Sequence, residues 1–267
     1  MKSVAVTAAF LLGVMLCSLG LDAATSAMTV RILTYNIHHG EGMDGVFDLQ
    51  RLADIIASTK PDLVAIQEVD ERTRRSGGVN QLEELARLTG LHPTFGRAME
   101  FQDGGYCVGI LSRWKAISVE NQPLPTAPDR EPRTVLTVVV EPVPHRPRIA
   151  FTSTHFDSGR GTELRTAQAA ALNDLVASGD DSAALRILAG DLNSGPDTEA
   201  VSTLRTKWTD VSGNDRPTLS VSGRLSYSVD WAFVQSPSPW RVVESRVVDA
   251  PVASDHRPVL VVLELVP

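Results

Sequence analysis

Cysteine is nearly absent from the 267-residue chain, which holds only Cys17 and Cys107. Cys17 lies in an apolar N-terminal segment, so a protein that has lost this segment keeps one thiol and cannot form an internal disulfide. Cysteine clusters and histidine pairs at His-x-x-x-His spacing are also lacking. These absences argue against a disulfide scaffold and against a structural zinc site.

Positive charge is in deficit as well. The chain has 25 Lys and Arg against 32 Asp and Glu, which gives a formal net charge of −7. A negative domain has no overall attraction for a polyphosphate backbone, so the balance disfavours nucleic acid as a partner without excluding a local basic cleft. No ladder of aromatic residues offers stacking for bases. The local positive charge that exists is interleaved with acids: Arg72, Arg74, Arg75 and Arg97 beside Asp70, Glu71 and Glu100.

The N-terminal segment has the pattern of a secretory signal peptide. Lys2 is followed by an uncharged run over residues 3–21 and then by the small residues of 23–27. We therefore predict a signal peptide over residues 1–27, cleaved after Ala24 or Ala27, and a secreted or periplasmic protein. An uncleaved membrane anchor is the alternative, because the apolar run is long enough to span a bilayer. If the leader is cleaved, no stable membrane insertion is expected.

The remaining residues, 28–267, show no repeat, low-complexity tract or interior linker, and we predict that they form one domain. Apolar residues recur with helical period over 48–60, 80–89 and 162–178. Strands are predicted over 29–37, 63–66, 94–98, 106–112, 133–141, 148–154, 185–189, 229–234, 242–248 and 259–265. A proline-rich segment, 123–132, is predicted to be a surface loop. Since hairpins occur beside crossovers, we expect an α/β domain with two packed sheets and helices outside.

Polar groups capable of chemistry follow five of these strands. The stretch 187–193 shows the pattern best, because Asp191 and Asn193 alternate in an extended backbone and can share a face. Gly190 removes a side chain where something must come close. One such ending is explained by a turn, but five along one chain favour a catalytic cleft. The groups concerned are Asn36, Glu68, His155, Asp191 with Asn193, and Asp255 with His256.

Five short motifs then resemble, in order, those of the endonuclease/exonuclease/phosphatase superfamily with its deoxyribonuclease-I-like fold. They are Tyr35-Asn36-Ile37, Gln67-Glu68-Val69, Thr154-His155-Phe156-Asp157, Gly190-Asp191-Leu192-Asn193 and Ser254-Asp255-His256-Arg257-Pro258. The resemblance covers residues 31–265. It implies a four-layer α/β/β/α sandwich of two mixed β-sheets with helices outside, and Mg²⁺-dependent hydrolysis of phosphate esters. Cys107 departs from the pattern, since glycine is usual there.

The resemblance also implies roles for single residues. Asn36, Glu68 and Asp255 would hold Mg²⁺, with Mn²⁺ as a substitute, and oxygen donors of this kind are the ligands that Mg²⁺ prefers. Asp191 and Asn193 would orient and activate the attacking water. His155 would either donate to a phosphate oxygen or act as a general acid.

His256 would contact the phosphate while Asp230 holds its ring, which fixes the tautomer and favours the imidazolium. The plain alternative for Asp230 is a capped strand start. Arg133 would clamp the phosphate and Tyr106 would hydrogen-bond to it. The alternatives are a solvated arginine and a tyrosine that fills the sheet edge.

The leading hypothesis is an exported metal-dependent phosphodiesterase or phosphomonoesterase, a monomer, acting on a small or lipid-linked phosphate ester. The alternative is a secreted endonuclease or exonuclease acting on DNA or RNA. A non-catalytic phosphate-binding module is disfavoured because every expected polar position is filled.

Overall fold

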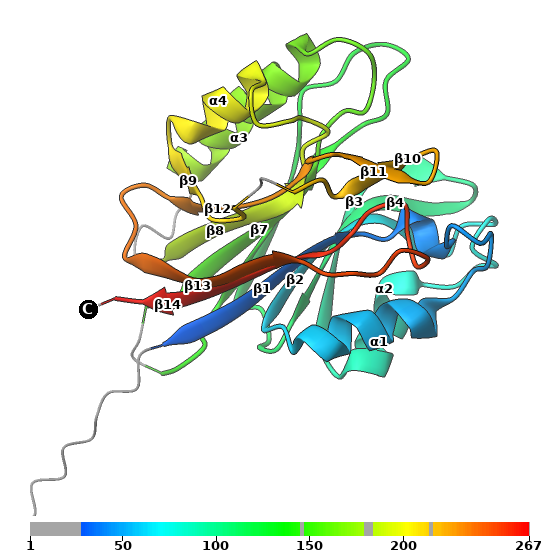
Figure 1. Ribbon diagram of the computed structural model, residues 1–267, viewed down its shortest axis with the longest axis horizontal. Helices are drawn as coiled ribbons and strands as arrows, with labels where there is room; N and C mark the ends of the chain where they lie inside the picture. The colour runs from blue at the N-terminus through cyan, green and yellow to red at the C-terminus, as the bar shows by residue number, and fades with distance from the viewer. Residues whose placement is uncertain (1–27, 145–146, 179–183, 214–215, 267) are drawn as a thin grey trace, which may run out of the picture.

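The computed structural model describes residues 28–144, 147–178, 184–213 and 216–266 (Figure 1). They form two six-stranded sheets, one two-stranded sheet, four α-helices and a short 3-10 helix. The predicted signal peptide lies outside the described residues. Among those residues, no helix combines the length and apolar character needed to span a membrane.

The first sheet contains β1 (Thr29–Asn36), β2 (Leu63–Glu71), β3 (His92–Phe101), β4 (Gly104–Ser112), β13 (Trp240–Val247) and β14 (Val259–Leu265). Their order across the sheet is β13-β14-β1-β2-β4-β3. β1 and β2 are parallel, and the other pairs are antiparallel. The sheet is therefore mixed, and the crossover from β1 to β2 brings the ends of these two strands together.

The second sheet contains β5 (Ser118–Pro123), β6 (Thr134–Val140), β7 (Ile149–His155), β8 (Leu185–Asp191), β9 (Trp208–Asp210) and β12 (Asp230–Gln235). Their order is β5-β6-β7-β8-β12-β9, with β7 and β8 parallel. A separate hairpin of β10 (Leu219–Val221) and β11 (Arg224–Tyr227) stands beside this sheet (Figure 1). A short 3-10 helix, η1 (His38–Gly40), follows β1.

Helices cover the outer face of each sheet. α1 (Leu49–Thr59) and α2 (Gln81–Thr89) pack on the first sheet, and α3 (Glu163–Ser178) and α4 (Glu199–Arg205) on the second (Figure 1). The side chains of Asp48 and Asn80 accept hydrogen bonds from backbone N–H groups of the first turns of α1 and α2, which stabilises both helix starts. The predicted four-layer α/β/β/α sandwich is confirmed.

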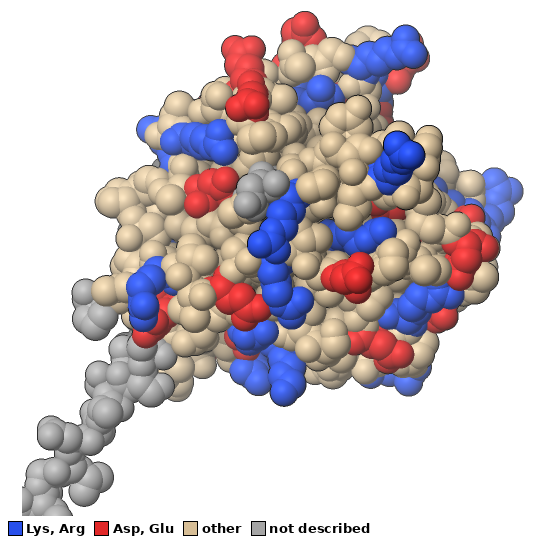
Figure 2. Space-filling model, viewed as in Figure 1, with Lys and Arg blue, Asp and Glu red and all other residues tan. Residues whose placement is uncertain are grey.

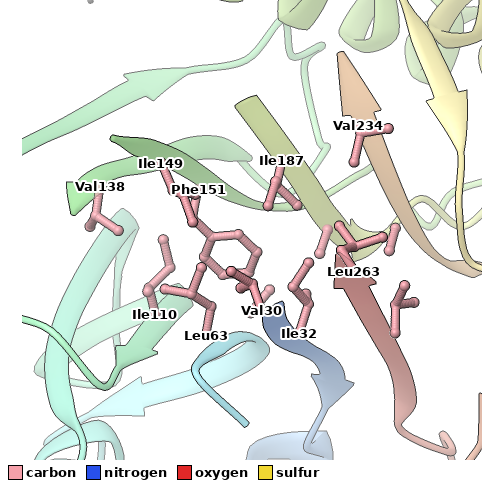
Figure 3. Packing of buried hydrophobic residues seen from close by; sticks show 14 of the residues in the cluster. Val30, Ile32, Leu63, Ile110, Val138, Ile149, Phe151, Ile187, Val234 and Leu263 are labelled. Atoms are coloured by element: carbon pink, nitrogen blue, oxygen red, sulfur yellow. The ribbon is translucent and has the colours of Figure 1, made fainter. Parts of the chain in front are cut away.

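The inner faces of the two sheets form the central core (Figure 3). Successive residues of a strand face opposite sides, so Val30 and Ile32 point into this core while Leu33 and Tyr35 point toward α1 and α2. The same alternation runs to the ends of the strands. A polar residue that lies an even number of positions after a core residue, at the end of its strand, therefore also faces the space between the sheets.

Several elements are absent from the periodicity-based prediction. β5 is an edge strand that is exposed along nearly its whole length, so it has no apolar alternation. α4 makes only two turns, and the hairpin strands have three and four residues. The rest of the proline-rich segment, 124–132, is a loop as predicted.

Candidate active site

Asn36 and Asp191 join the two sheets at the site. Asn36 ends β1 with the parity of Val30 and Ile32, and Asp191 ends β8 with the parity of Ile187 and Ala189. Both side chains are buried and face inward, where Asn36 Nδ2 donates to Asp191 Oδ2 at 3.1 Å. Alternation along two strands therefore brings together residues that are 155 positions apart in the chain.

Glu68 reaches the site through a break in that alternation. It lies within β2 and not at its end, and strict alternation would place it on the helix-facing side with Val64 and Ile66. The pairing of β2 with β4 shifts between Gln67 and Val69, and Glu68 has the left-handed φ of 60°. This bulge lets Glu68 Oε1 accept a hydrogen bond from Asn36 Nδ2 at 3.1 Å.

His155 ends β7 and is held on both sides of its ring. Arg133 Nη1 lies 3.1 Å from His155 Nδ1 and 2.7 Å from Glu131 Oε1. Arginine only donates, so Nδ1 accepts in the contact with Arg133, while Nε2 lies 3.4 Å from Asp191 Oδ2 and 3.0 Å from the Asn193 Nδ2 donor, so that donors approach both ring nitrogens. Burial, Arg133 and His256 lower the pKa of His155 well below its usual value. A neutral ring fits this environment better than a general acid does.

Arg133 therefore lies inside the protein and not on its surface, which removes the alternative of a solvated arginine. Asn193 Nδ2 lies 3.0 Å from His155 Nε2, and the Asn193 backbone N–H donates to Asp191 Oδ1 at 2.8 Å. Asn193 thus positions both neighbours.

Asp230 and His256 form a buried pair. Asp230 begins β12 on the inner face, and its Oδ2 accepts a hydrogen bond from His256 Nδ1 at 2.8 Å. His256 Nε2 lies 3.7 Å from Asp191 Oδ2. Burial lowers the pKa of His256, but the Asp230 and Asp191 carboxylates raise it more, to about 10. This shift favours the imidazolium form of His256 at neutral pH.

One carboxylate oxygen, Asp191 Oδ2, is the meeting point of the site. Asn36, His155 and His256 all approach it. Burial raises the pKa of Asp191, the nearby imidazolium of His256 lowers it, and Asp230 raises it, with a result of about 7. A carboxylate with this pKa can accept a proton near neutral pH.

Asp255 and Tyr106 are placed less centrally. Asp255 precedes β14 and does not follow a strand, and its Oδ1 accepts from Ser254 Oγ at 3.3 Å. Ser254 Oγ also lies 2.8 Å from the backbone oxygen of Asn36, which ties this loop to β1. Tyr106 is buried on β4 opposite Asp70, and the Arg75 guanidinium lies 5.2 Å from its ring centroid.

Thr218 is a site residue that sequence reasoning misses. Its buried hydroxyl accepts hydrogen bonds from the backbone N–H groups of Val229 and Asp230, both at 3.3 Å. Its carbonyl oxygen accepts from the N–H of Arg257 at 2.7 Å. Thr218 thus links the two segments that carry Asp230 and His256. Its contacts are to backbone atoms, so no motif marks them.

The donor set was tested against a divalent cation. Two carboxylates, Glu68 and Asp191, converge on the Asn36 NH₂ group, and carboxylate oxygens suit Mg²⁺ or Mn²⁺; the Asn36 oxygen accepts from the His38 N–H and would join them only after the amide rotates. Asp191, Asp230 and His256 also have ligand atoms within 4.8 Å of one another. A metal held by all three would need the neutral form of His256, whereas Asp230 and Asp191 favour its imidazolium. The residues around Asn36 and Glu68 fit the metal better.

Four residues in or beside the site have a left-handed backbone conformation. Glu68, Asn193, His38 and His39 all have positive φ, between 42° and 60°. Each costs conformational energy for a residue with a side chain. His38 donates its backbone N–H to Asn36 Oδ1 at 3.1 Å, so part of this unusual backbone orients the amide at the centre.

Comparison with known proteins agrees with this geometry. A family model described as "Endonuclease/Exonuclease/phosphatase family" matches residues 33–256. The chain belongs to this family. Its members include phosphatases and nucleases that hydrolyse phosphoesters, and the family is generally dependent on a divalent metal. No curated protein matches the sequence.

Solved structures share the fold at low sequence identity. An endonuclease/exonuclease/phosphatase from Beutenbergia cavernae has a TM-score of 0.72 and 23% identity, over 89% of this chain and 72% of that one. The mannosyl-6-phosphatase of Bacteroides thetaiotaomicron has a TM-score of 0.69 and 16% identity, over 88% and 99%. The human Nocturnin catalytic domain with bound sulfate has a TM-score of 0.70 and 18% identity, over 90% and 98%.

Proposed function

We propose that the protein is an exported, Mg²⁺-dependent phosphoesterase that acts on a phosphodiester or phosphomonoester of a small or lipid-linked substrate. The observation that carries the proposal is the convergence of Asn36, His155 and His256 on Asp191 Oδ2. When water attacks phosphorus, a base must take the proton of the water, and cationic and neutral polar groups must stabilise the phosphate oxygens. Asp191, His256 and His155 supply these three kinds of group.

Asn36 and Glu68, with Asp255 through water, would hold the metal ion. When bound, Mg²⁺ would neutralise charge on the phosphate oxygens and polarise the reacting oxygens. The Asn36 amide is already oriented by the His38 N–H and by Glu68.

Asp191 would accept the proton of the attacking water, which Asn193 helps to position. The His256 imidazolium, held by Asp230, would stabilise the negative charge that develops on the phosphate oxygens. His155 would present Nε2 to the phosphate as a neutral ring, while Arg133 holds the ring at Nδ1. A contact or a pKa shift described above supports each of these roles.

Charge neutralisation around the site favours a small substrate over nucleic acid. Arg75 forms a bidentate pair with Asp70, Arg97 pairs with Glu71 and Glu100, and Arg74 pairs with Asp103. In Figure 2 acids lie among the Lys and Arg side chains over most of the visible face, and one short run of Lys and Arg side chains lies at its centre. A polyphosphate strand would need several uncompensated cations. A phosphatase among the similar folds is consistent with this preference.

A substrate screen tests the function. Purified protein is incubated with p-nitrophenyl phosphate, bis-p-nitrophenyl phosphate, phospholipids and plasmid DNA, each with Mg²⁺ and with EDTA. We expect Mg²⁺-dependent hydrolysis of a small or lipid-linked ester and little cleavage of DNA. Fast plasmid cleavage with no turnover of small esters would favour the nuclease, and inactivity toward all four would contradict the proposal.

Export is tested separately. N-terminal sequencing of protein from the medium or periplasm should give a start near Thr25 or Met28. Protein that keeps Met1 and is found in a membrane fraction would show that residues 1–27 form an uncleaved membrane anchor.

A further inference from the structure

A groove of about 340 Å³ lies beside residues 254–258, the segment that carries His256 and is called the catalytic segment below. The groove has no part in the steps described above. Pro217, Leu225, Val247 and Val248 form its apolar lining. Its charged residues are Arg216, Arg257 and Asp249. The lining thus combines apolar side chains with two arginines and one aspartate.

Arg257 places a guanidinium in the lining of the groove. This residue is only 7% exposed, and its Nη1 donates to Ser254 O at 3.2 Å. A guanidinium that is largely shielded from water attracts an anion more strongly than a fully solvated one does.

The groove adjoins the segment that carries His256. Arg257 directly follows His256, and its backbone N–H donates to Thr218. Ser220 on β10 donates to the Asp255 carbonyl at 2.7 Å, and Leu219 pairs with His256. The β10–β11 hairpin is therefore fixed to the catalytic segment by backbone hydrogen bonds (Figure 1).

The hairpin also presents apolar side chains to solvent. Val221, Leu225 and Tyr227 are 45%, 43% and 58% exposed. Of these, Leu225 lines the groove and Val221 does not. This difference provides a matched pair of positions on one hairpin.

We propose that this groove binds the organic group carried by the substrate phosphate, and that this group is an amphiphilic anion: an apolar body that bears a carboxylate or phosphate. Arg257 and Arg216 would face the anionic end, and Leu225, Val247 and Val248 would cover the apolar body. The proposal rests on the phosphoesterase function and narrows its substrate class. The Asp249 carboxylate in the lining would repel the anionic group of a ligand. Ligands whose anionic group lies close to the arginines are therefore preferred.

Titration calorimetry with decanoate tests the groove without requiring turnover. We expect wild-type protein to bind decanoate at least about tenfold more tightly than uncharged decanol, because decanol brings no charge to the arginines. Leu225→Asp and Arg216→Gln should each weaken decanoate binding about tenfold or more. Val221→Asp, which adds the same charge to the same hairpin outside the groove, should bind decanoate like the wild type.

Kinetics with bis-p-nitrophenyl phosphate connect the groove to the reaction. One nitrophenyl group of this diester leaves, and the other would occupy the groove. Decanoate should therefore raise KM for the wild type without lowering kcat, and this effect should be lost in Leu225→Asp.

The two proposals can fail separately. Hydrolysis of phosphoesters by a protein that binds no decanoate, or that binds it equally with Leu225→Asp and Val221→Asp, would overturn the groove proposal alone. Decanoate binding that Leu225→Asp abolishes, in a protein inactive toward every phosphoester, would overturn the proposed function and leave an amphiphile-binding groove.

Discussion

Asp230 Oδ2 accepts a hydrogen bond from His256 Nδ1 at 2.8 Å, and both side chains are buried. We predict that the two act as one unit. His256→Ala should lower kcat/KM for a synthetic diester about 10²- to 10⁴-fold. Adding Asp230→Asn should cost no more than about a further twofold, because coupled residues are not additive. The measurement is a double-mutant cycle with the exposed Asp54→Asn as control, and fully additive losses would return Asp230 to a structural role.

The charge on His256 predicts a pH dependence. Burial lowers its pKa, but Asp230 and Asp191 raise it to about 10, so the contribution of the imidazolium should be lost as pH rises through that value. The same shift stabilises the fold below the unfolded pKa of about 6.5, and this stabilisation fades toward pH 10. NMR titration of the His256 ring in metal-free protein measures the pKa directly. Asp230→Asn should lower it and move the alkaline limb of the rate profile in the same direction, whereas a wild-type ring titrating near 6.5 would contradict the assignment.

Glu68 is predicted to hold the metal. Glu68→Gln keeps the shape of the side chain and removes its charge, so turnover should fall at least about 10²-fold and Mg²⁺ affinity should weaken. Circular dichroism should show an unchanged fold. Glu120→Gln, on exposed β5, serves as the control. Wild-type Mg²⁺ affinity and activity in Glu68→Gln would remove Glu68 from the metal site.

Gly190 is predicted to be required for packing of the strands. A Cβ at this position would clash with the backbone carbonyl oxygen of Thr154 on the neighbouring strand β7. Gly190→Ala should destabilise the protein by about 1–3 kcal/mol, which lowers Tm by several degrees. Gly195→Ala, where an added Cβ meets nothing within 4 Å, should change Tm little. Equal melting temperatures for Gly190→Ala and Gly195→Ala would contradict the prediction. They would show that β7 and β8 can move apart without loss of stability.

Much of the fold could be predicted because its strands and helices carry strong patterns. The apolar stripe and the Asp48 cap predict α1 to within one residue at each end. Asn36, His155 and Asp191 end β1, β7 and β8 as expected, and alternation explains why all three face inward. Gly190 was expected to admit something close, and the neighbour is the backbone of β7.

The remaining features depend on contacts that leave no local pattern. The residues around Glu68 contain no sequence signal for a bulge. The left-handed φ of Glu68 accompanies a shift in the pairing of β2 with β4, which local sequence does not predict. The Asp230–His256 contact spans 26 residues, and only the family resemblance suggested it. The burial of Arg133 follows from its contacts with Glu131 and His155, which a lone arginine before a strand does not predict.

The site is divided between the two sheets, since Asn36 and Glu68 come from the first, and His155, Asp191 and Asp230 come from the second. Neither half contains a complete set of reacting groups. The interface between the sheets must therefore hold its alignment to within a hydrogen-bond length, and the 3.1 Å contact of Asn36 with Asp191 reports on that alignment. Slight sliding of one sheet over the other would separate these groups while every strand stayed paired. The proposed activity should therefore be more sensitive to sheet docking than secondary structure is.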